Sequence, residues 1–155
     1  MGKIKKFKLY WADAWGFIQY GCDSTIEITE EGKTIILFMV NMEPFSITIG
    51  DKENEFLQVI KNTGIEKLNG YGYDSVDICD GDQWRIDIIA DDLDVFSAGH
   101  NTCPNELKDL LVYLHEKWNL PICKIAEYYY RKSSKKLDRY GKRHKLSEKW
   151  RMYYG

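Results

Sequence analysis

The sequence has few residues of the kinds that build metal sites, disulfide frameworks and nucleotide sites. Its 155 residues include only four cysteines, three histidines and three prolines, and no two cysteines form a C-x-x-C pair. It also lacks a glycine-rich phosphate loop, a nucleophile elbow and an H-E-x-x-H motif. We therefore expect a protein that is not an enzyme, with no catalytic residues, no cofactor and no metal site.

Long apolar runs are missing as well. No stretch approaches 18 apolar residues, so no membrane-spanning helix is expected. The basic residues of Met1–Lys6 are not followed by the apolar run of a signal peptide. The four widely spaced cysteines fit free thiols in a reducing compartment better than disulfides. These absences predict a cytoplasmic protein without membrane contact.

The composition is that of a globular protein. Hydrophobic residues make up 44% and charged residues 30%, which is enough for one packed domain with a possible appendage. Aromatic residues make up 14%, with eleven tyrosines and five tryptophans. Such residues favour both strands and binding surfaces.

The net charge of −2 conceals an uneven distribution. The segment Arg131–Arg151 holds ten of the 22 Lys/Arg residues but only two of the 24 acids. This asymmetry suggests an acidic α+β domain over residues 1–121 and a basic, aromatic, helical tail over residues 122–155. Oppositely charged segments dock on each other or address separate partners.

Strand and helix patterns cover most of the predicted domain. Phe7, Leu9 and Trp11 alternate with polar residues, which predicts a strand. Further strands are predicted at residues 17–20, 25–29, 34–41, 45–49, 75–79, 83–90 and 95–98, and a loop at 68–73. One helix is expected after Asp51 as its N-cap, and another opens at Pro104 with Thr102 or Cys103 as its cap. The second helix carries one apolar stripe: Leu107, Leu110, Leu111, Leu114 and Trp118.

Two segments resemble each other in length and pattern. Ile35–Gly50 and Trp84–Gly99 have equal lengths, end in glycine and precede an amphipathic helix. One hypothesis is a duplicated βββα unit with a period of about 49 residues; the alternative is that any such segment with short turns looks alike. Either way the predicted fold class is α+β, a curved antiparallel β-sheet with helices on one face. The basic extension is expected to be helical from near Cys123, interrupted at Gly141, with a last helix over residues 144–151.

Carboxylates concentrate in the centre of the chain. They are interpreted as solvated turn and strand residues. The alternatives are a hard-cation site or an acidic face that mimics nucleic acid or meets a basic partner. The acidic face that we single out as a binding candidate comprises Asp77, Asp80, Asp82, Asp87, Asp91, Asp92 and Asp94.

Thiol and imidazole groups are sparse but not absent. His100 and Cys103 are three residues apart, yet no second pair completes a zinc site. Cys103 is also the alternative nucleophile, should the protein be an enzyme. The junction from Gly99 to Pro104 is interpreted mainly as a structural device between strand and helix.

The tail is the most suggestive functional feature. Cations meet phosphates, and aromatic faces stack on bases. The alternatives are a protein partner, docking on the acidic body, or no specific role. The candidate residues are Arg131, Lys132, Lys135, Lys136, Arg139, Tyr140, Lys142, Arg143, Lys145, Lys149, Trp150 and Arg151.

One motif carries a resemblance. Asp80-Gly81-Asp82-Gln83-Trp84, followed by Gly99, Asn101 and Pro104 before a leucine-rich helix, resembles small uncharacterised proteins of Gram-positive gut bacteria and their mobile elements. The resemblance implies a small antiparallel sheet with helices. It also suggests a role in phage or mobile-element conflict, such as inhibition of a nuclease-type, CRISPR-like defence complex.

The leading hypothesis is therefore a non-enzymatic, macromolecule-binding protein whose partner is a protein or a ribonucleoprotein. The alternative is a nucleic-acid-binding protein that acts through the basic aromatic tail. Charge segregation without a catalytic motif is the observation on which both depend. Neither predicts an oligomeric state.

Overall fold

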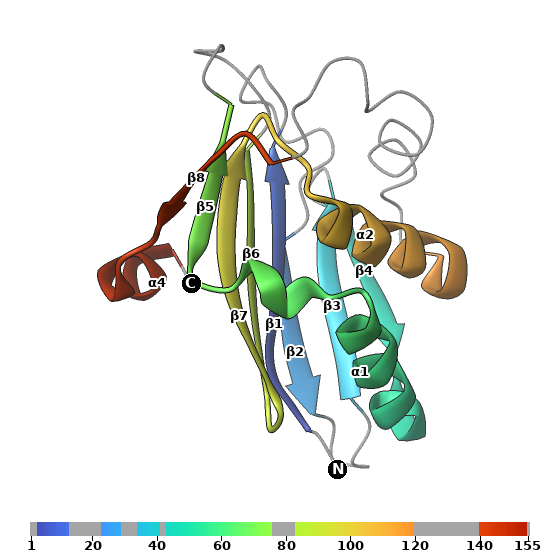
Figure 1. Ribbon diagram of the computed structural model, residues 1–155. Coiled ribbons are helices and arrows are strands. Elements are labelled where there is room, and N and C mark those ends of the chain that lie inside the picture. The colour runs from blue at the N-terminus through green and yellow to red at the C-terminus, as the bar shows by residue number, and fades with distance from the viewer. Residues whose placement is uncertain are drawn as a thin grey trace.

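The computed structural model describes residues 3–12, 23–28, 34–40, 43–75, 83–119 and 140–154. Side chains are described at residues 3–10, 46–75, 83–119 and 140–152. Within these residues the chain combines two β-sheets with helices (Figure 1). The predicted α+β class, with a curved and mostly antiparallel sheet, is confirmed.

The larger sheet has five strands: β1 (Ile4–Ala12), β5 (Tyr71–Asp74), β6 (Gln83–Ala90), β7 (Leu93–His100) and β8 (Lys142–Lys145). They lie in the order β1-β6-β7-β5-β8. Neighbouring strands are antiparallel except for β5 and β7, which run parallel. The first and last strands of the described chain thus end up at opposite edges.

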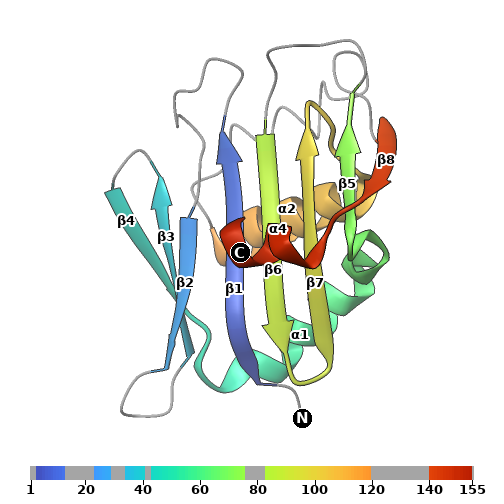
Figure 2. The ribbon, with the colours of Figure 1, turned by 90° about the vertical axis from the view of Figure 1, so that its left-hand side faces the viewer.

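The smaller sheet is an antiparallel meander of β2 (Asp23–Ile28), β3 (Thr34–Val40) and β4 (Glu43–Thr48). Pro44 lies in β4 at the edge of this sheet, where its missing N–H is tolerated. β2 lies beside β1 in both views, so the two sheets continue one another as a curved layer (Figures 1 and 2).

Two of the described helices cover one face of this layer and another described helix lies on the opposite face. α1 (Glu53–Asn62) and α2 (Asn105–Trp118) pack on the face that we call inner. α4 (Glu148–Tyr154) crosses the opposite, outer face (Figure 2). Two short 3-10 helices, η1 (Gly50–Lys52) and η2 (Ile65–Leu68), flank α1.

The core lies between the inner face and α1 and α2. Phe7 and Leu9 of β1 and Trp84 of β6 are at most 1% exposed, as the alternating pattern predicted. The apolar stripe of α2 is also confirmed, because its four leucines are buried and Trp118 packs against the core. The apolar strand face predicted by alternation and the apolar helix face predicted by 3.6-residue spacing therefore pack against each other at one interface.

Trp84 ties this core to the start of α2. Its indole N–H donates to the Thr102 carbonyl at 2.9 Å, and the Thr102 hydroxyl donates to the Tyr73 carbonyl at 2.7 Å. Gly99 faces the indole so closely that a side chain there would collide with it. Pro104 acts as the N-cap and not as the first helical residue, and no side chain caps the helix, so the predicted capping by Thr102 or Cys103 is wrong.

Three other local predictions are wrong. Asp51 is inside η1, and the N-cap of α1 is Lys52. The predicted loop at residues 68–73 contains the end of η2 and most of β5, because this segment pairs with β7 and β8. Residues 142–145 of the tail are a strand and not a helix, and α4 begins at Glu148 and not at residue 144.

The two predicted units share a hairpin followed by an inner-face helix. The last pair of the β3–β4 hairpin is Val40 and Glu43, and that of β6–β7 is Ala90 and Leu93, a separation of 50 residues. The helices begin 52 residues apart, at Glu53 and Asn105. Duplication stays a prediction. Residues 76–82 and the boundary proposed at residues 121 and 122 lie outside the described residues.

Candidate functional site: the outer face of the sheet

The outer face of the larger sheet carries the polar half of each alternating strand. β1 contributes Lys6 and Tyr10, β6 contributes Arg85 and Asp87, and β7 contributes Phe96, because the neighbours of these residues point into the core. Only α4 lies across this face among the described helices (Figure 2). The acidic face and the basic tail of the sequence analysis meet here.

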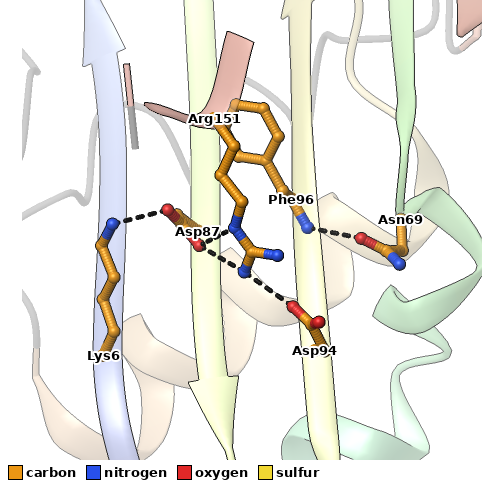
Figure 3. Close-up of polar contacts among 6 residues, drawn as sticks. All are labelled: Lys6, Asn69, Asp87, Asp94, Phe96 and Arg151. Atoms are coloured by element: carbon orange, nitrogen blue, oxygen red, sulfur yellow. Dashed lines mark hydrogen bonds and ion pairs between the residues drawn. The ribbon is translucent and has the colours of Figure 1, made fainter. Parts of the chain in front are cut away.

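An ion cluster anchors α4 to the sheet (Figure 3). Asp87 is only 1% exposed and accepts from Lys6 Nζ at 2.6 Å through Oδ2. Its Oδ1 accepts from Arg151 Nε at 3.1 Å and from Arg151 Nη2 at 2.7 Å. The same Nη2 lies 2.7 Å from Asp94 Oδ1. Two cations and two carboxylates therefore neutralise each other at the centre of the outer face.

The cluster fixes the charge of Arg151. Burial disfavours the guanidinium ion, but hydrogen bonds to Asp87 and Asp94 outweigh this, so the pKa of Arg151 is raised above its ordinary value. Removing one partner of a buried pair leaves an uncompensated charge, which costs about 3–5 kcal/mol. Arg151 is thus a positioning residue that holds α4.

Aromatic contacts also hold α4 against the outer face of the sheet. The Trp150 ring lies 6.4 Å from that of Phe96, and the Arg151 guanidinium is 5.7 Å from the Phe96 ring centre. The Phe96 backbone N–H donates to Asn69 Oδ1 at 2.8 Å, which joins β7 to the start of β5. A seven-residue helix is unstable alone, so α4 depends on these contacts.

β8 forms a basic edge beside α4. Lys142, Arg143, His144 and Lys145 are all exposed, and β8 pairs with β5. The Arg143 guanidinium lies 4.3 Å from the ring centre of Tyr71. His144 Nδ1 is 3.3 Å from Asp74 Oδ2. Neither Lys142 nor Lys145 has an ion pair among the described residues.

A hollow of about 230 Å³ lies on the outer face and is lined by residues of β1, β5, β6, β7 and β8. Gly72 and Ala98, which carry little or no side chain, are among its lining residues. The imidazole of His144 packs over Gly72, where a Cβ would come within 2.5 Å of its Cε1. Aromatic and polar side chains form the walls: Tyr10, Gln83, Arg85, His100, His144 and Trp150.

Two predicted acids lie away from this face, in the β6–β7 turn. Asp91 accepts from the Lys3 backbone N–H at 3.1 Å and pairs with Lys5 at 3.3 Å, which lowers the pKa of Asp91. Asp92 accepts from Lys61 Nζ at 2.5 Å, and its pKa is lowered by that contact. The four described acids of the predicted face are therefore split between two places, each paired with cations.

Tyr140 reaches the inner side of the sheet edge. Its hydroxyl donates to the Glu106 carboxylate at 3.1 Å, and its ring lies 6.1 Å from that of Tyr73. Burial and the bond to Glu106 raise the pKa of Tyr140. Lys149 is exposed on α4. The described tail residues thus lie on both faces of the sheet, Tyr140 on the inner face and Arg151 on the outer face.

The thiol and imidazole of the H-x-x-C pair point in different directions. His100 lines the hollow of the outer face, whereas Cys103 is buried in the core. Buried thiols in apolar surroundings have little thiolate character. Within the described part of the chain, no group of three His, Cys, Asp or Glu residues has the spacing of a metal site.

Several candidate residues lie outside the description: Arg131, Lys132, Lys135, Lys136, Arg139, Asp77, Asp80 and Asp82. Sequence reasoning missed Lys6, Tyr10, Tyr71, Arg85 and His144. Lys6 and Tyr10 could have been found from strand alternation, which places them on the face of β1 that Phe7 and Leu9 do not occupy. Nothing in the sequence indicated that β8 would bring His144 to β5.

Comparison with protein-family models, with curated proteins and with solved structures found no match. None of the described helices is long and apolar enough to cross a membrane. The geometry of the outer face is therefore the basis for a functional proposal.

Proposed function

We propose that this chain is a non-enzymatic, macromolecule-binding protein that holds an acidic protein partner against β8 and the adjoining outer face. The observation that carries the proposal is the division of the tail's cations. Arg151 is committed to Asp87 and Asp94, whereas Lys142 and Lys145 are exposed on an ordered strand without an ion pair among the described residues. The exposed cations are the ones left for a partner.

Electrostatics favour a partner of opposite charge. The part of the tail that is described carries five Lys/Arg residues and one acid, Glu148. Rim charges of this kind accelerate association and select partners more than they add affinity. The hollow beside β8 gives the partner room for side chains, which charge alone does not provide.

The test is affinity capture with paired charge-reversal variants. Lys142→Glu with Lys145→Glu changes the proposed surface, and Lys52→Glu with Lys117→Glu changes two exposed lysines on α1's N-cap and on α2. Both variants have the same net charge. We expect the first to lose the captured protein and the second to retain it. Equal capture by both variants would refute the proposal.

A second candidate is a nucleic-acid-binding protein that uses the same strand. The stacked pair of Arg143 and Tyr71 favours it, because cation–aromatic platforms also support bases. Mobility-shift assays on single-stranded RNA and DNA should then show binding that weakens with salt. Loss of Lys142 and Lys145 would reduce the slope of log K against log[salt] by about 1.4 for single strands. No shift with the unaltered protein excludes this candidate.

The resemblance suggests one particular partner. We infer that a nuclease-type, CRISPR-like defence complex is a suitable first candidate, and that the protein acts in the cytoplasm, where phage and mobile elements meet such complexes. The experiment is target cleavage by a purified complex in the presence of increasing amounts of the protein. Inhibition that depends on Lys142 and Lys145 supports this assignment, and undiminished cleavage contradicts it.

A further inference from the structure

β8 is the last strand of the five-stranded sheet in the described chain. Among the described strands it pairs with β5 alone, and it lies at the right-hand border of the sheet in Figure 2. Each of its four residues is exposed. An exposed edge of this kind offers unpaired backbone groups as a template for another strand.

The register shows which backbone groups are available. The Leu146 N–H donates to the Gly70 carbonyl at 2.8 Å, and this pair continues the β5–β8 ladder. Hydrogen-bonded pairs alternate along an antiparallel ladder. His144 is therefore the next residue that bonds to β5, and the backbone N–H and C=O groups of Arg143 and Lys145 point away from the sheet.

The charges of β8 restrict what can pair with it. Lys142 and His144 project on the outer face, and Arg143 and Lys145 project on the inner face, so both faces of the edge are basic. Pairing with β8 of a second copy would set like charges opposite each other, which is unfavourable. Basic edges commonly block such self-association. An acidic strand, in contrast, would satisfy both the backbone groups and the side chains.

We propose that β8 is a docking edge that takes an acidic, extended segment of a partner protein as a sixth strand of the sheet. This rests on the proposed function and gives it a binding mode, β-strand addition. The outward N–H and C=O groups of Arg143 and Lys145 provide the affinity that does not depend on side chains. The exposed lysines select acidic segments and set the approach.

The test separates backbone pairing from charge. A fluorescent peptide of alternating Glu and Thr is titrated against the full chain, with anisotropy as the signal. Lys145→Ala removes one charge and keeps the outward N–H, whereas Lys145→Pro removes both. Neither change alters a β5–β8 hydrogen bond, because the backbone N–H and C=O groups of Lys145 point away from β5. Circular dichroism and thermal melting are the controls that both variants must pass as folded proteins before their binding is compared.

We expect Lys145→Pro to bind the peptide about 2- to 10-fold more weakly than Lys145→Ala, the effect of one hydrogen bond. A peptide that is N-methylated on alternate residues should lose binding although its charge is unchanged. A peptide of alternating Lys and Thr should not bind.

Four results would overturn the docking edge. One is equal binding by Lys145→Pro and Lys145→Ala, and another is retained binding of the N-methylated peptide. In either case a charge-dependent partner surface, and with it the proposed function, still stands. The third is tighter binding of a single-stranded oligonucleotide that competes with the acidic peptide. The last is a β8-dependent dimer in sedimentation, since it would place a second copy on the edge.

Discussion

Replacing Arg151 by methionine tests whether the C-terminal helix is held by the buried ion cluster. The substitution keeps much of the aliphatic volume over Phe96 but removes the guanidinium from Asp87. Asp87 then loses two hydrogen bonds, at 3.1 and 2.7 Å, and keeps only Lys6. Hydrogen bonds to charged groups contribute about 1.5–3 kcal/mol each.

The expected loss is smaller than the sum of these contacts. If α4 detaches from the sheet, water reaches Asp87 and hydrates it, so the docking free energy of α4 sets the upper limit. The contact with Asp94 adds little, because the side chain of Asp94 is 64% exposed. We therefore expect Arg151→Met to lower the free energy of unfolding by about 2–3 kcal/mol.

Equilibrium unfolding in urea measures this loss, and hydrogen exchange at the amides of α4 localises it. Lys149→Met is the matched control, since Lys149 is an exposed lysine on the same helix; it should change stability by less than about 0.5 kcal/mol. Combining Arg151→Met with Asp87→Asn should recover part of the loss, because the buried charge is then gone. A loss below about 0.5 kcal/mol for Arg151→Met, or no recovery in the double variant, would refute the reasoning.

Three further predictions concern the core, the start of β8 and alkaline pH. Leu110→Ala removes a fully buried side chain from the stripe of α2 and should cost about 2–5 kcal/mol in urea unfolding. Gly141→Ala should cost about 1–3 kcal/mol and speed exchange of the β8 amides, because Gly141 has φ +58° and a Cβ would collide with the Asp74 carbonyl. Burial and Glu106 raise the pKa of Tyr140 above its ordinary value of 10.0. The neutral Tyr140 side chain therefore stabilises the fold below about pH 10, and this contribution is lost as pH rises through the folded pKa. Glu106→Gln should therefore lower the pH at which the Tyr140 phenolate forms, measured by tyrosinate absorbance against Tyr140→Phe.

The elements that the sequence predicted well are those with a strong local period. The alternation at Trp84, Ile86 and Ile88 and the leucine stripe of α2 both depend on side-chain spacing within one element, so no partner needs to be known. The strand bounds of β6 match the predicted range of residues 83–90. The side chains of the outer face could also be derived from the alternation along β1 and β6.

The elements that the sequence missed depend on partners far along the chain. Tyr71–Asp74 looks like a loop because it contains glycine and is short, and it becomes a strand only by lying between β7 and β8. Residues 142–145 are highly charged and carry no apolar period, so their strand state follows from pairing with β5. The contact between Asp87 and Arg151 joins residues 64 positions apart and requires the complete sheet order.

This arrangement changes how the role of the tail has to be examined. A chain that ends before Tyr140 would lose β8, expose the backbone edge of β5 and uncover Asp87 and Phe96 on the outer face. An exposed sheet edge and apolar patch promote association, so lost or altered binding in such a truncation would report damage to the sheet as readily as removal of a binding site. Point variants at Lys142 and Lys145 leave the ion cluster and the β5–β8 ladder in place. A change in binding that they produce can therefore be assigned to the surface of β8 itself.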